Sequence, residues 1–263
     1  MKKIFYLFAI TTVLFSCQKV IDVDLNEANP TPVLEGIYTA EDSTVRVKLS
    51  LTSSYFNDSP STSIDAAVVN ITDGAGITSN VPSIGNGNYE LQNYIPNFNT
   101  TYTLSVLYDG VTYSAECDLA DTVSLDDITY EYFPGFFGGD PGYVVYLNFQ
   151  DPANTPNFYQ IILSLNGEEF GGLEDMFTQD DLLSDGNPVE RPLFSGDFFQ
   201  IGDTVGMELR SVDEDVYYYI NEAISIVGGS ASAAPANPTT NWNNKALGYF
   251  SAYGNSRKEV IIQ

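Results

Sequence analysis

The chain has 263 residues, of which 35 are Asp or Glu, 10 are Lys or Arg and none is His, so its net charge at pH 7 is −25. This negative field repels phosphate backbones and anionic head groups, which excludes nucleic acids and direct adhesion to an anionic bilayer surface. Hydrophobic residues make up 43% and aromatic residues 13% of the chain, which is too apolar for a disordered protein. The chain therefore has to bury a sizeable core.

The first residues predict a lipoprotein signal peptide over residues 1–16. Lys2 and Lys3 precede the apolar run Ile4–Phe15, which is too short to cross a hydrocarbon core of roughly 30 Å as a helix. The run leads directly into Cys17 and resembles the lipobox of bacterial lipoproteins, in which the cysteine thiol is acylated. We therefore expect Cys17 to anchor the protein by lipid; the alternative is a plain secretory signal with an incidental cysteine. Because Gln18 is not the aspartate that retains such proteins in the inner membrane, the outer membrane is the expected location.

Residues 17–31 have no consistent hydrophobic period and are predicted to form a tether. Residues 32–121 then contain short runs rich in Val, Ile, Thr and Tyr between turn residues, which predicts a β-sandwich of immunoglobulin-like size. Asp109-Gly110 joins two of these runs in a sequence typical of a type I′ hairpin, and Cys117 falls on the inward-facing side of its run. The predicted strands are Val33–Thr39, Thr44–Leu51, Ala67–Thr72, Tyr89–Leu91, Thr101–Tyr108 and Val111–Cys117.

A polar segment, Leu119–Asp127, marks the predicted boundary to a second β-rich domain over residues 122–263. Its one prominent helix is expected near residues 213–228, where apolar residues recur at spacings of three and four after an acidic start. We expect this helix to pack against the second sheet. The alternative to two domains is one continuous sheet system. The predicted strands are Ile128–Phe133, Tyr143–Gln150, Phe158–Leu165, Phe198–Ile201, Thr204–Val212, Ala246–Ala252 and Val260–Ile262.

The residue inventory favours a protein that is not an enzyme and that needs no cofactor. Without histidine there is no Ser-His-Asp or Cys-His machinery, no imidazole base and no His-bound metal. No glycine-rich phosphate loop is present. Two alternatives remain: a carboxylate-based hydrolase, for which only geometry could decide, and a calcium-dependent binding module. Oxygen ligands for calcium could come from Asp180, Asp181, Asp185 and Asn187, although their spacing is not that of an EF-hand loop.

A long segment of small residues, 228–244, contains the only tryptophan of the chain, Trp242. Loops of this length inside a compact domain are often functional, and an aromatic anchor often dominates an interface. Trp242, with Tyr249 and Phe250 of the following run, is therefore the candidate contact for a partner. The alternative is that Trp242 packs back onto the helix as part of the core.

Several motifs resemble those of the outer-membrane lipoproteins grouped as the domain of unknown function numbered 4249. They include "CQKVIDVDL" from Cys17, "VKLSLTSSYFND" from Val47, "TYTLSVLYDGVTYSAE" from Thr101 and "ANPTTNWNNKALGYFSAYGNSRKEVII" from Ala236. The resemblance covers nearly the whole chain after Cys17 and carries no catalytic residue. It implies a lipoprotein of Bacteroidota-type bacteria, on the cell surface or the periplasmic face. It also implies an accessory role beside a TonB-dependent outer-membrane transporter.

Overall fold

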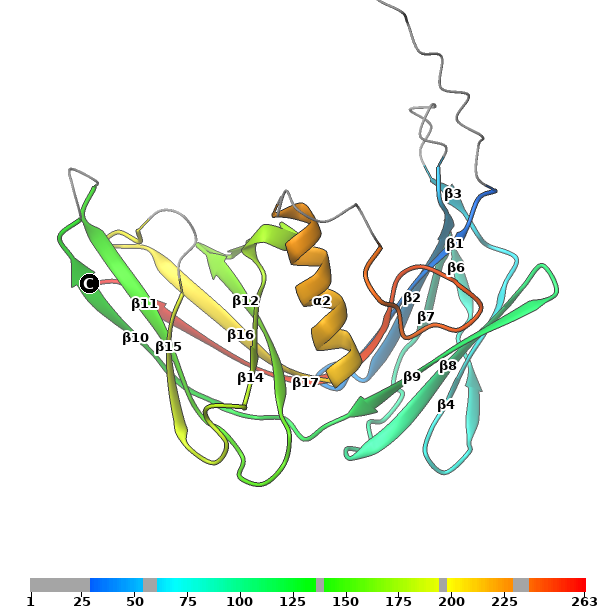
Figure 1. Ribbon diagram of the computed structural model, residues 1–263, viewed down its shortest axis with the longest axis horizontal. Coiled ribbons are helices and arrows are strands. Elements are labelled where there is room, and N and C mark those ends of the chain that lie inside the picture. The colour runs from blue at the N-terminus through cyan, green and yellow to red at the C-terminus, as the bar shows by residue number, and fades with distance from the viewer. Residues whose placement is uncertain (1–28, 54–60, 136–139, 194–197, 229–236) are drawn as a thin grey trace, which may run out of the picture.

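A computed structural model describes residues 29–53, 61–135, 140–193, 198–228 and 237–263 (Figure 1). The predicted signal peptide, Cys17 and most of the predicted tether lie outside the described residues, as do residues 229–236 of the long segment. No helix within the described ranges is long and apolar enough to cross a membrane.

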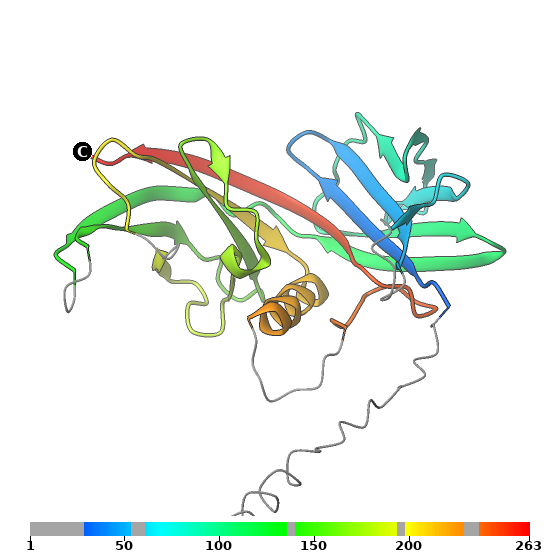
Figure 2. The ribbon, with the colours of Figure 1, turned by 90° about the horizontal axis from the view of Figure 1, so that it is seen from above.

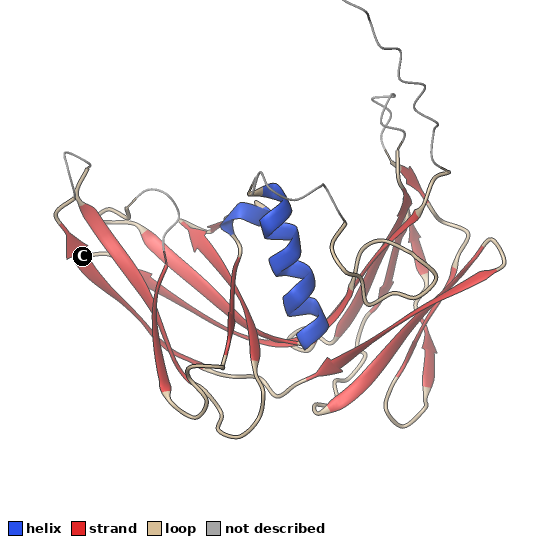
Figure 3. Ribbon diagram, in the orientation of Figure 1, coloured by secondary structure: helices blue, strands red, loops and turns tan. Residues whose placement is uncertain are grey.

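Strands dominate the described residues, which contain one α-helix and one 3₁₀ turn (Figure 3). The helical elements are η2 (Leu173–Asp175) and α2 (Glu214–Val227). The strands of the first half are β1 (Pro32–Thr39), β2 (Thr44–Leu51), β3 (Thr62–Ser63), β4 (Val68–Thr72), β5 (Thr78–Asn80), β6 (Ser83–Gly85), β7 (Asn88–Leu91), β8 (Thr100–Tyr108) and β9 (Val111–Leu119). Those of the second half are β10 (Leu125–Phe133), β11 (Gly142–Gln150), β12 (Phe158–Leu165), β13 (Glu168–Glu169), β14 (Phe177–Asp180), β15 (Pro188–Leu193), β16 (Thr204–Val212) and β17 (Phe250–Ile261).

One long sheet backs both halves of the molecule. Its main path runs β13-β12-β16-β17-β1-β2-β7-β6, with β14 and β3 paired at its sides. A four-stranded sheet, β5-β4-β8-β9, covers the first half, and a three-stranded sheet, β10-β11-β15, covers the second. The result is two sandwiches at the ends of an elongated molecule with α2 between them (Figure 1). The predicted fold class, mostly β with an immunoglobulin-like sandwich and one prominent helix, is confirmed.

Strand β17 belongs to both sandwiches and runs along the molecule from one to the other (Figure 2). Its first residues, Phe250–Tyr253, pair in parallel with β1, and its remaining residues from Gly254 pair antiparallel with β16. The exchange of partners therefore takes place between Tyr253 and Gly254. This continuity places the first residues of the last strand in the core of the predicted N-terminal sandwich.

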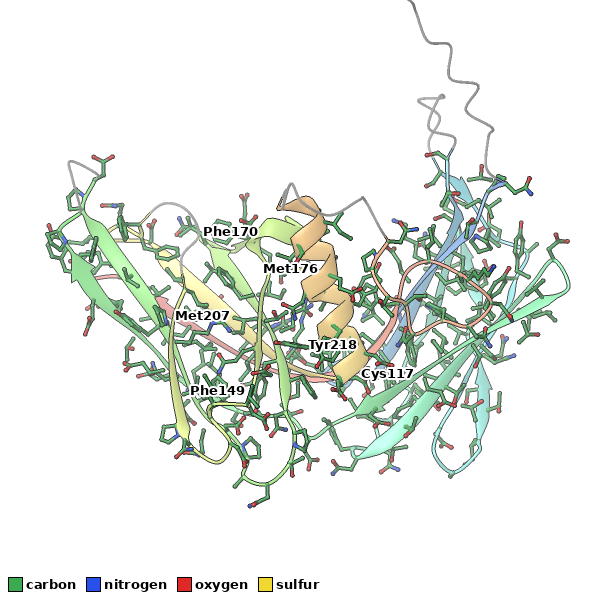
Figure 4. The ribbon with its side chains drawn as sticks, in the orientation of Figure 1. Cys117, Phe149, Phe170, Met176, Met207 and Tyr218 are labelled. Carbon is green, nitrogen blue, oxygen red and sulfur yellow. The ribbon has the colours of Figure 1, made fainter. Side chains whose placement is uncertain are left out.

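Each sandwich has its own hydrophobic core. The first core contains Leu34, Tyr38, Leu104 and Cys117, and it also takes in Phe250 from the far end of the chain. The second lies between β10-β11-β15 and β12-β16-β17; Figure 4 shows Phe149 and Met207 in this half of the molecule. Cys117 is 2% exposed, as its position in the alternating strand predicts.

Helix α2 starts after Asp213, whose side-chain oxygen accepts the backbone N–H of Asp215 as an N-cap. Its buried face presents Val216 and Ile220 to the core of the first sandwich, while the helix also contacts η2, β12 and β14 of the second half. The expectation of packing against the second sheet was therefore incomplete, because the helix bridges both halves.

The strand predictions fail where tertiary contacts decide. Residues 198–201 form only an isolated bridge between Phe199 and Tyr143. The predicted strands at 246–252 and 260–262 overlap the two ends of the single strand β17, Phe250–Ile261. The short strands β3, β5, β6, β13, β14 and β15 were not predicted. These segments are brief or carry turn residues and prolines, so their alternation is too weak to read.

Candidate functional site

The structure buries Trp242 and Phe250 and leaves Tyr249 partly buried, so a partner contact through Trp242 and Phe250 is wrong. Trp242 is 4% exposed and Phe250 is 0% exposed. The indole N–H of Trp242 donates to the carbonyl oxygen of Leu34 at 2.9 Å, which fixes the ring in the first core. The ring of Tyr249 packs on Tyr219 of α2 with centroids 4.7 Å apart, and burial raises the pKa of Tyr249. Trp242 is thus core, as the sequence alternative held, and its indole N–H is bound to β1.

The asparagines around Trp242 tie this loop to strand β9 by hydrogen bonds. The side chain of Asn241 donates to the carbonyl of Glu116 at 3.1 Å, and the side chain of Asn244 donates to that of Thr112 at 2.8 Å. Backbone and side-chain bonds of Asn243 reach Ser114 in the same strand. Strand β9 is the edge of its sheet, and unpaired strand edges invite aggregation. The described part of the loop therefore covers an edge strand.

A groove of about 560 Å³ opens between the two sandwiches and is the main candidate site. Strands β8 and β9 supply one wall through Thr101, Asp118 and Leu119. The β11–β12 loop and the start of α2 supply the other. Pockets that hold small ligands have volumes of roughly 300–1,000 Å³ and occur preferentially at domain interfaces. The lining residues are Asn99, Thr101, Asp118, Leu119, Ala120, Thr155, Pro156, Phe158, Val212, Asp213, Glu214 and Asp215.

The charged groups in the groove are all acidic. Asp118, Asp213, Glu214 and Asp215 line it, and no Lys or Arg does. The two oxygens of Asp213 accept backbone N–H groups from Asp118 at 3.0 Å and Asp215 at 2.9 Å. Burial raises the pKa of Asp213, and the nearby carboxylates of Asp118 and Asp215 raise it further, while the two backbone bonds oppose the rise. The groove is therefore lined by carboxylates that no lining Lys or Arg pairs.

One aromatic ring lines the groove, and two tyrosines of α2 lie beside this ring. Phe158 lines the groove, and its ring centroid lies 5.2 Å from that of Tyr217 and 6.5 Å from that of Tyr218 on α2. Tyr218 is 51% exposed, and Figure 4 shows it on the helix between the two sandwiches. The hydroxyl of Tyr217 donates to Asp180 at 3.3 Å, which fixes its ring. Beside the carboxylates, the groove thus offers an aromatic surface.

A second acidic group lies behind the wall formed by the β11–β12 loop. One carboxylate oxygen from each of Asp151, Asp181 and Asp185 lies within 4.8 Å of the others, a spacing that could hold a cation. Two of these aspartates, Asp181 and Asp185, were among the calcium ligands considered from sequence; Asp180 instead accepts from Tyr217.

These carboxylates already hold the β11–β12 loop in place. Asp151 is 1% exposed and accepts the Tyr159 hydroxyl at 2.5 Å, and the backbone N–H groups of Asn157 and Asn154 bind Asp181 and Asp185 at 2.9 and 2.6 Å. Loop order at this wall of the groove therefore depends on them.

The sequence analysis missed the groove because its walls come from distant segments. Asp118 and Asp213 are 95 positions apart, and neither belongs to a recognisable motif. The only local signal was the acidic start of the helix, which the helix dipole explains without a ligand. Likewise, the contribution of Asp151 to the aspartate group was not predicted, because it lies 30 residues from Asp181.

The comparisons with known proteins place the chain by sequence. The family whose model matches residues 18–259 is described as "Domain of unknown function (DUF4249)". A search of curated proteins finds no match. Among solved structures, the chain is similar to a two-domain fibronectin type III segment from chicken tenascin, with 12% identity over 72% of this chain and 89% of that one. The TM-score of this match is 0.22.

Proposed function

The chain belongs to the DUF4249 family, and from this premise we propose that it is a lipid-anchored accessory protein of the outer membrane. It acts by binding and not by catalysis, and the groove between its sandwiches is the binding surface. The observation that carries the proposal is this groove, a ligand-sized hollow between two sandwiches that share strand β17. Shared sheet pairing keeps the two walls in a fixed relation, which reduces the entropy lost on binding.

The residue inventory supports binding over catalysis. The chain has no histidine, and its one cysteine after Cys17, Cys117, is buried with a pKa raised by that burial. A buried thiol of raised pKa is a poor nucleophile. The acidic side chains that line the groove are exposed or capped by backbone N–H groups, and no base with an activated nucleophile accompanies them among the described residues.

The membrane part of the proposal rests on the sequence. Lys2, Lys3, the apolar run and Cys17 form a lipoprotein signal, and residues 17–31 give the anchored protein reach from the bilayer. The family resemblance points to a TonB-dependent transporter as the partner in nutrient capture or uptake. We propose that the anchored protein presents a ligand from its groove to that transporter.

Affinity purification from membranes without crosslinking tests the partner. The tagged parent is expected to co-elute with a TonB-dependent transporter in near-stoichiometric amount. The matched variant Cys17→Ala, which cannot be acylated, is expected to leave the membrane fraction and to lose the transporter. Recovery of the parent alone, from cells that express the transporter, would refute the partnership, and a Cys17→Ala variant that stayed in the membrane pellet would refute the anchor.

A second candidate function, calcium-dependent binding, is favoured by one observation, the approach of Asp151, Asp181 and Asp185 to within 4.8 Å. Calcium binds six to eight oxygens, so the three carboxylates would need further oxygen ligands. Calorimetry decides between the two functions. Heat of binding at micromolar calcium that disappears in Asp185→Asn would put the calcium function first, and its absence would leave the groove.

A further inference from the structure

One edge strand of the second sandwich carries an inference about a partner that does not depend on the groove. We propose that strand β10 binds an extended segment of another protein, in which basic and apolar residues alternate, as an added strand of its sheet. Strand addition of this kind takes its affinity from main-chain hydrogen bonds and its specificity from alternate side chains. Three features of β10 support it: an open edge, the outward direction of its backbone groups, and the side chains beside them.

Strand β10 forms one end of the sheet β10-β11-β15, and no described segment pairs with its free side. Unpaired edges attract other chains, so proteins blunt them with short strands, proline, basic residues or a covering loop. The other described edge strands show these devices. Strands β3, β5, β6, β13 and β14 have two to four residues, β15 contains Pro188 and Pro192, β9 is covered by Asn241 and Asn244, and β17 beyond Gly254 carries Arg257 and Lys258. Strand β10 has nine residues without Pro, Lys or Arg, and only its start is interrupted by a bulge, between Leu125 and Asp127.

The backbone of β10 presents hydrogen-bonding groups to this free side. Tyr143 of β11 is the register partner of Tyr132. The N–H and C=O groups of Tyr143 both bond to Phe199 on the other side of β11, at 2.8 and 3.1 Å. The pair with Tyr132 is therefore a non-hydrogen-bonded pair, and such pairs recur at every second residue of an antiparallel ladder. Tyr132, Tyr130 and Ile128 thus point their N–H and C=O groups away from β11.

Two of the N–H groups on this side are open. The N–H of Ile128 donates to the side chain of Asp127 at 2.9 Å, which agrees with its outward direction and closes that position. The N–H groups of Tyr130 and Tyr132 have no acceptor among the described residues. An added strand would satisfy both donors and the carbonyl groups beside them.

The outer face beside this edge is acidic. Asp127 and Glu131 alternate with the core residue Ile128 and are exposed, and Glu190 of β15 lies on the same face in register with Asp127. Strands β10 and β11 contain no Lys or Arg. The one basic residue of β15, Arg191, donates to the carbonyl of Thr178 in β14, in the opposite sheet. Lys or Arg on the outer face of an added strand would complement these carboxylates.

The inner face of the same edge is aromatic. Tyr132 is 60% exposed, and its ring centroid lies 5.6 Å from that of Tyr143. Tyr130 packs on the other side against the second core and lies at the same distance from Tyr143. Apolar side chains on the inner face of an added strand would cover Tyr132. Because side chains alternate between the faces of a strand, the bound segment alternates basic and apolar residues.

A second copy of the chain is a poor occupant of this edge. It would bring Asp126, Asp127 and Glu131 of both copies onto adjacent strands, and β10 has no basic residue to pair with them. Like charges on adjacent strands destabilise a sheet. The net charge of −25 adds repulsion between the two copies. The edge therefore fits a different protein, with positive charge on the segment that binds.

Calorimetric titration of a synthetic peptide of four Lys-Val repeats, blocked at both ends, into the full chain in detergent tests the proposal. A salt concentration of about 150 mM screens charges that lie more than about 8 Å apart. Two control peptides have the same sequence and charge but carry N-methyl groups on all valines or on all lysines. Only one of these residue types can turn its N–H groups towards β10. One N-methylated peptide should therefore bind as the unmodified peptide does, and the other should bind at least about tenfold more weakly.

The variant Glu131→Lys places a basic residue on the edge itself. Peptide binding should weaken about tenfold, because a repulsion replaces an attraction. The matched control is Glu116→Lys, the same change at an exposed position of β9, whose edge is covered by Asn241. Its affinity should stay within about twofold of the parent, since distant exposed charges contribute little. Thermal melts verify the fold of both variants.

Amide hydrogen exchange, measured by mass spectrometry with fragmentation, locates the bound peptide. In the free chain the N–H groups of Tyr130 and Tyr132 should exchange quickly and those of Thr129 and Glu131 slowly, because only the latter bond to β11. The peptide should slow exchange at Tyr130 and Tyr132.

Four results would overturn the proposal. They are no binding of the unmodified peptide, equal affinity of all three peptides, equal weakening by Glu131→Lys and Glu116→Lys, and protection of Tyr130 and Tyr132 in the free chain. Protection that rises with protein concentration would assign the edge to a second copy instead. None of these measurements involves the groove or co-elution with the transporter, so their failure would leave the proposed function to its own test.

Discussion

Gly254 is the position at which β17 changes partner from β1 to β16, and replacing it with alanine should destabilise the whole molecule. An added Cβ at Gly254 would lie 2.0 Å from the Thr122 hydroxyl oxygen, 3.1 Å from Thr122 Cβ and 3.2 Å from a ring carbon of Phe98. Thr122 belongs to the segment that leads from the first sandwich to the second. The segment crosses so close to β17 that only glycine fits there without a shift.

The loss of stability in Gly254→Ala can be worked out from the groups that the added methyl group would displace. Overpacking of one methyl group in a tight site costs about 1–3 kcal/mol. The crossing segment is also tied to the long sheet, because the N–H groups of Val123 and Leu125 donate to the hydroxyls of Ser211 and Ser256 at 3.2 and 3.0 Å. Loss of one of these bonds would add about 1 kcal/mol. We expect Gly254→Ala to lower the free energy of unfolding by about 2 kcal/mol.

Urea unfolding, followed by far-ultraviolet circular dichroism, measures this loss. Gly171→Ala is the matched control, since an added Cβ there meets no heavy atom within 4 Å, and it should leave stability nearly unchanged. Thr122→Ala removes the clashing hydroxyl, so the double variant should recover most of the loss, which a double-mutant cycle would show as coupling. If Gly254→Ala matched the parent in stability, the close crossing would be refuted.

Three further predictions concern buried side chains. Trp242→Phe leaves the carbonyl of Leu34 without its indole donor, and chemical denaturation should show a loss of about 1–3 kcal/mol in the free energy of unfolding. In the parent, the tryptophan fluorescence should be blue-shifted and should resist quenching by acrylamide. Strong quenching in the native state would contradict the burial of Trp242. Glu208→Gln should lower the free energy of unfolding by about 2 kcal/mol at pH 7. Burial raises the pKa of Glu208, but the ion pairs with Arg210 and Arg257 outweigh burial and hold this pKa below its usual range. The carboxylate therefore stabilises the protein above about pH 4.3, and this stabilisation is lost as the pH falls through the folded pKa. Parent and variant should therefore converge in acid melts, and a constant gap would count against the ion pairs. Burial raises the pKa of the Cys117 thiol, so the native protein should resist alkylation at Cys117 while the unfolded protein is alkylated. Mass spectrometry measures the extent of labelling. Fast labelling of the native protein would contradict the burial of Cys117.

Local patterns predicted the regular elements well. Strands β2, β12 and β16 begin and end where their runs of strand-forming residues predict. Asp109 and Gly110 have φ values of 48° and 75°, as the predicted type I′ turn requires. Helix α2 starts after its acidic cap as predicted. In each case the information lies within one short segment.

The features that the sequence did not predict depend on contacts between distant segments. The sequence allows Trp242 to be either a partner anchor or a core residue. The bond of its indole N–H to Leu34, 208 positions away, decides for the core. The role of Asn241 and Asn244 as cover for the β9 edge needs the sheet order, which no local pattern contains. The groove needs both sandwiches in place. Site residues of this kind follow from topology and not from motifs.

The most direct test of the account is electron cryomicroscopy of the full chain, purified from membranes in detergent without crosslinking. The account predicts particles in which the chain contacts a TonB-dependent transporter, with the groove bordered by Asp118 and Asp213 open towards the transporter's outer mouth. Particles of the chain alone would contradict the proposed function. So would a complex in which the transporter seals the groove with its own side chains, because no ligand could then be handed over.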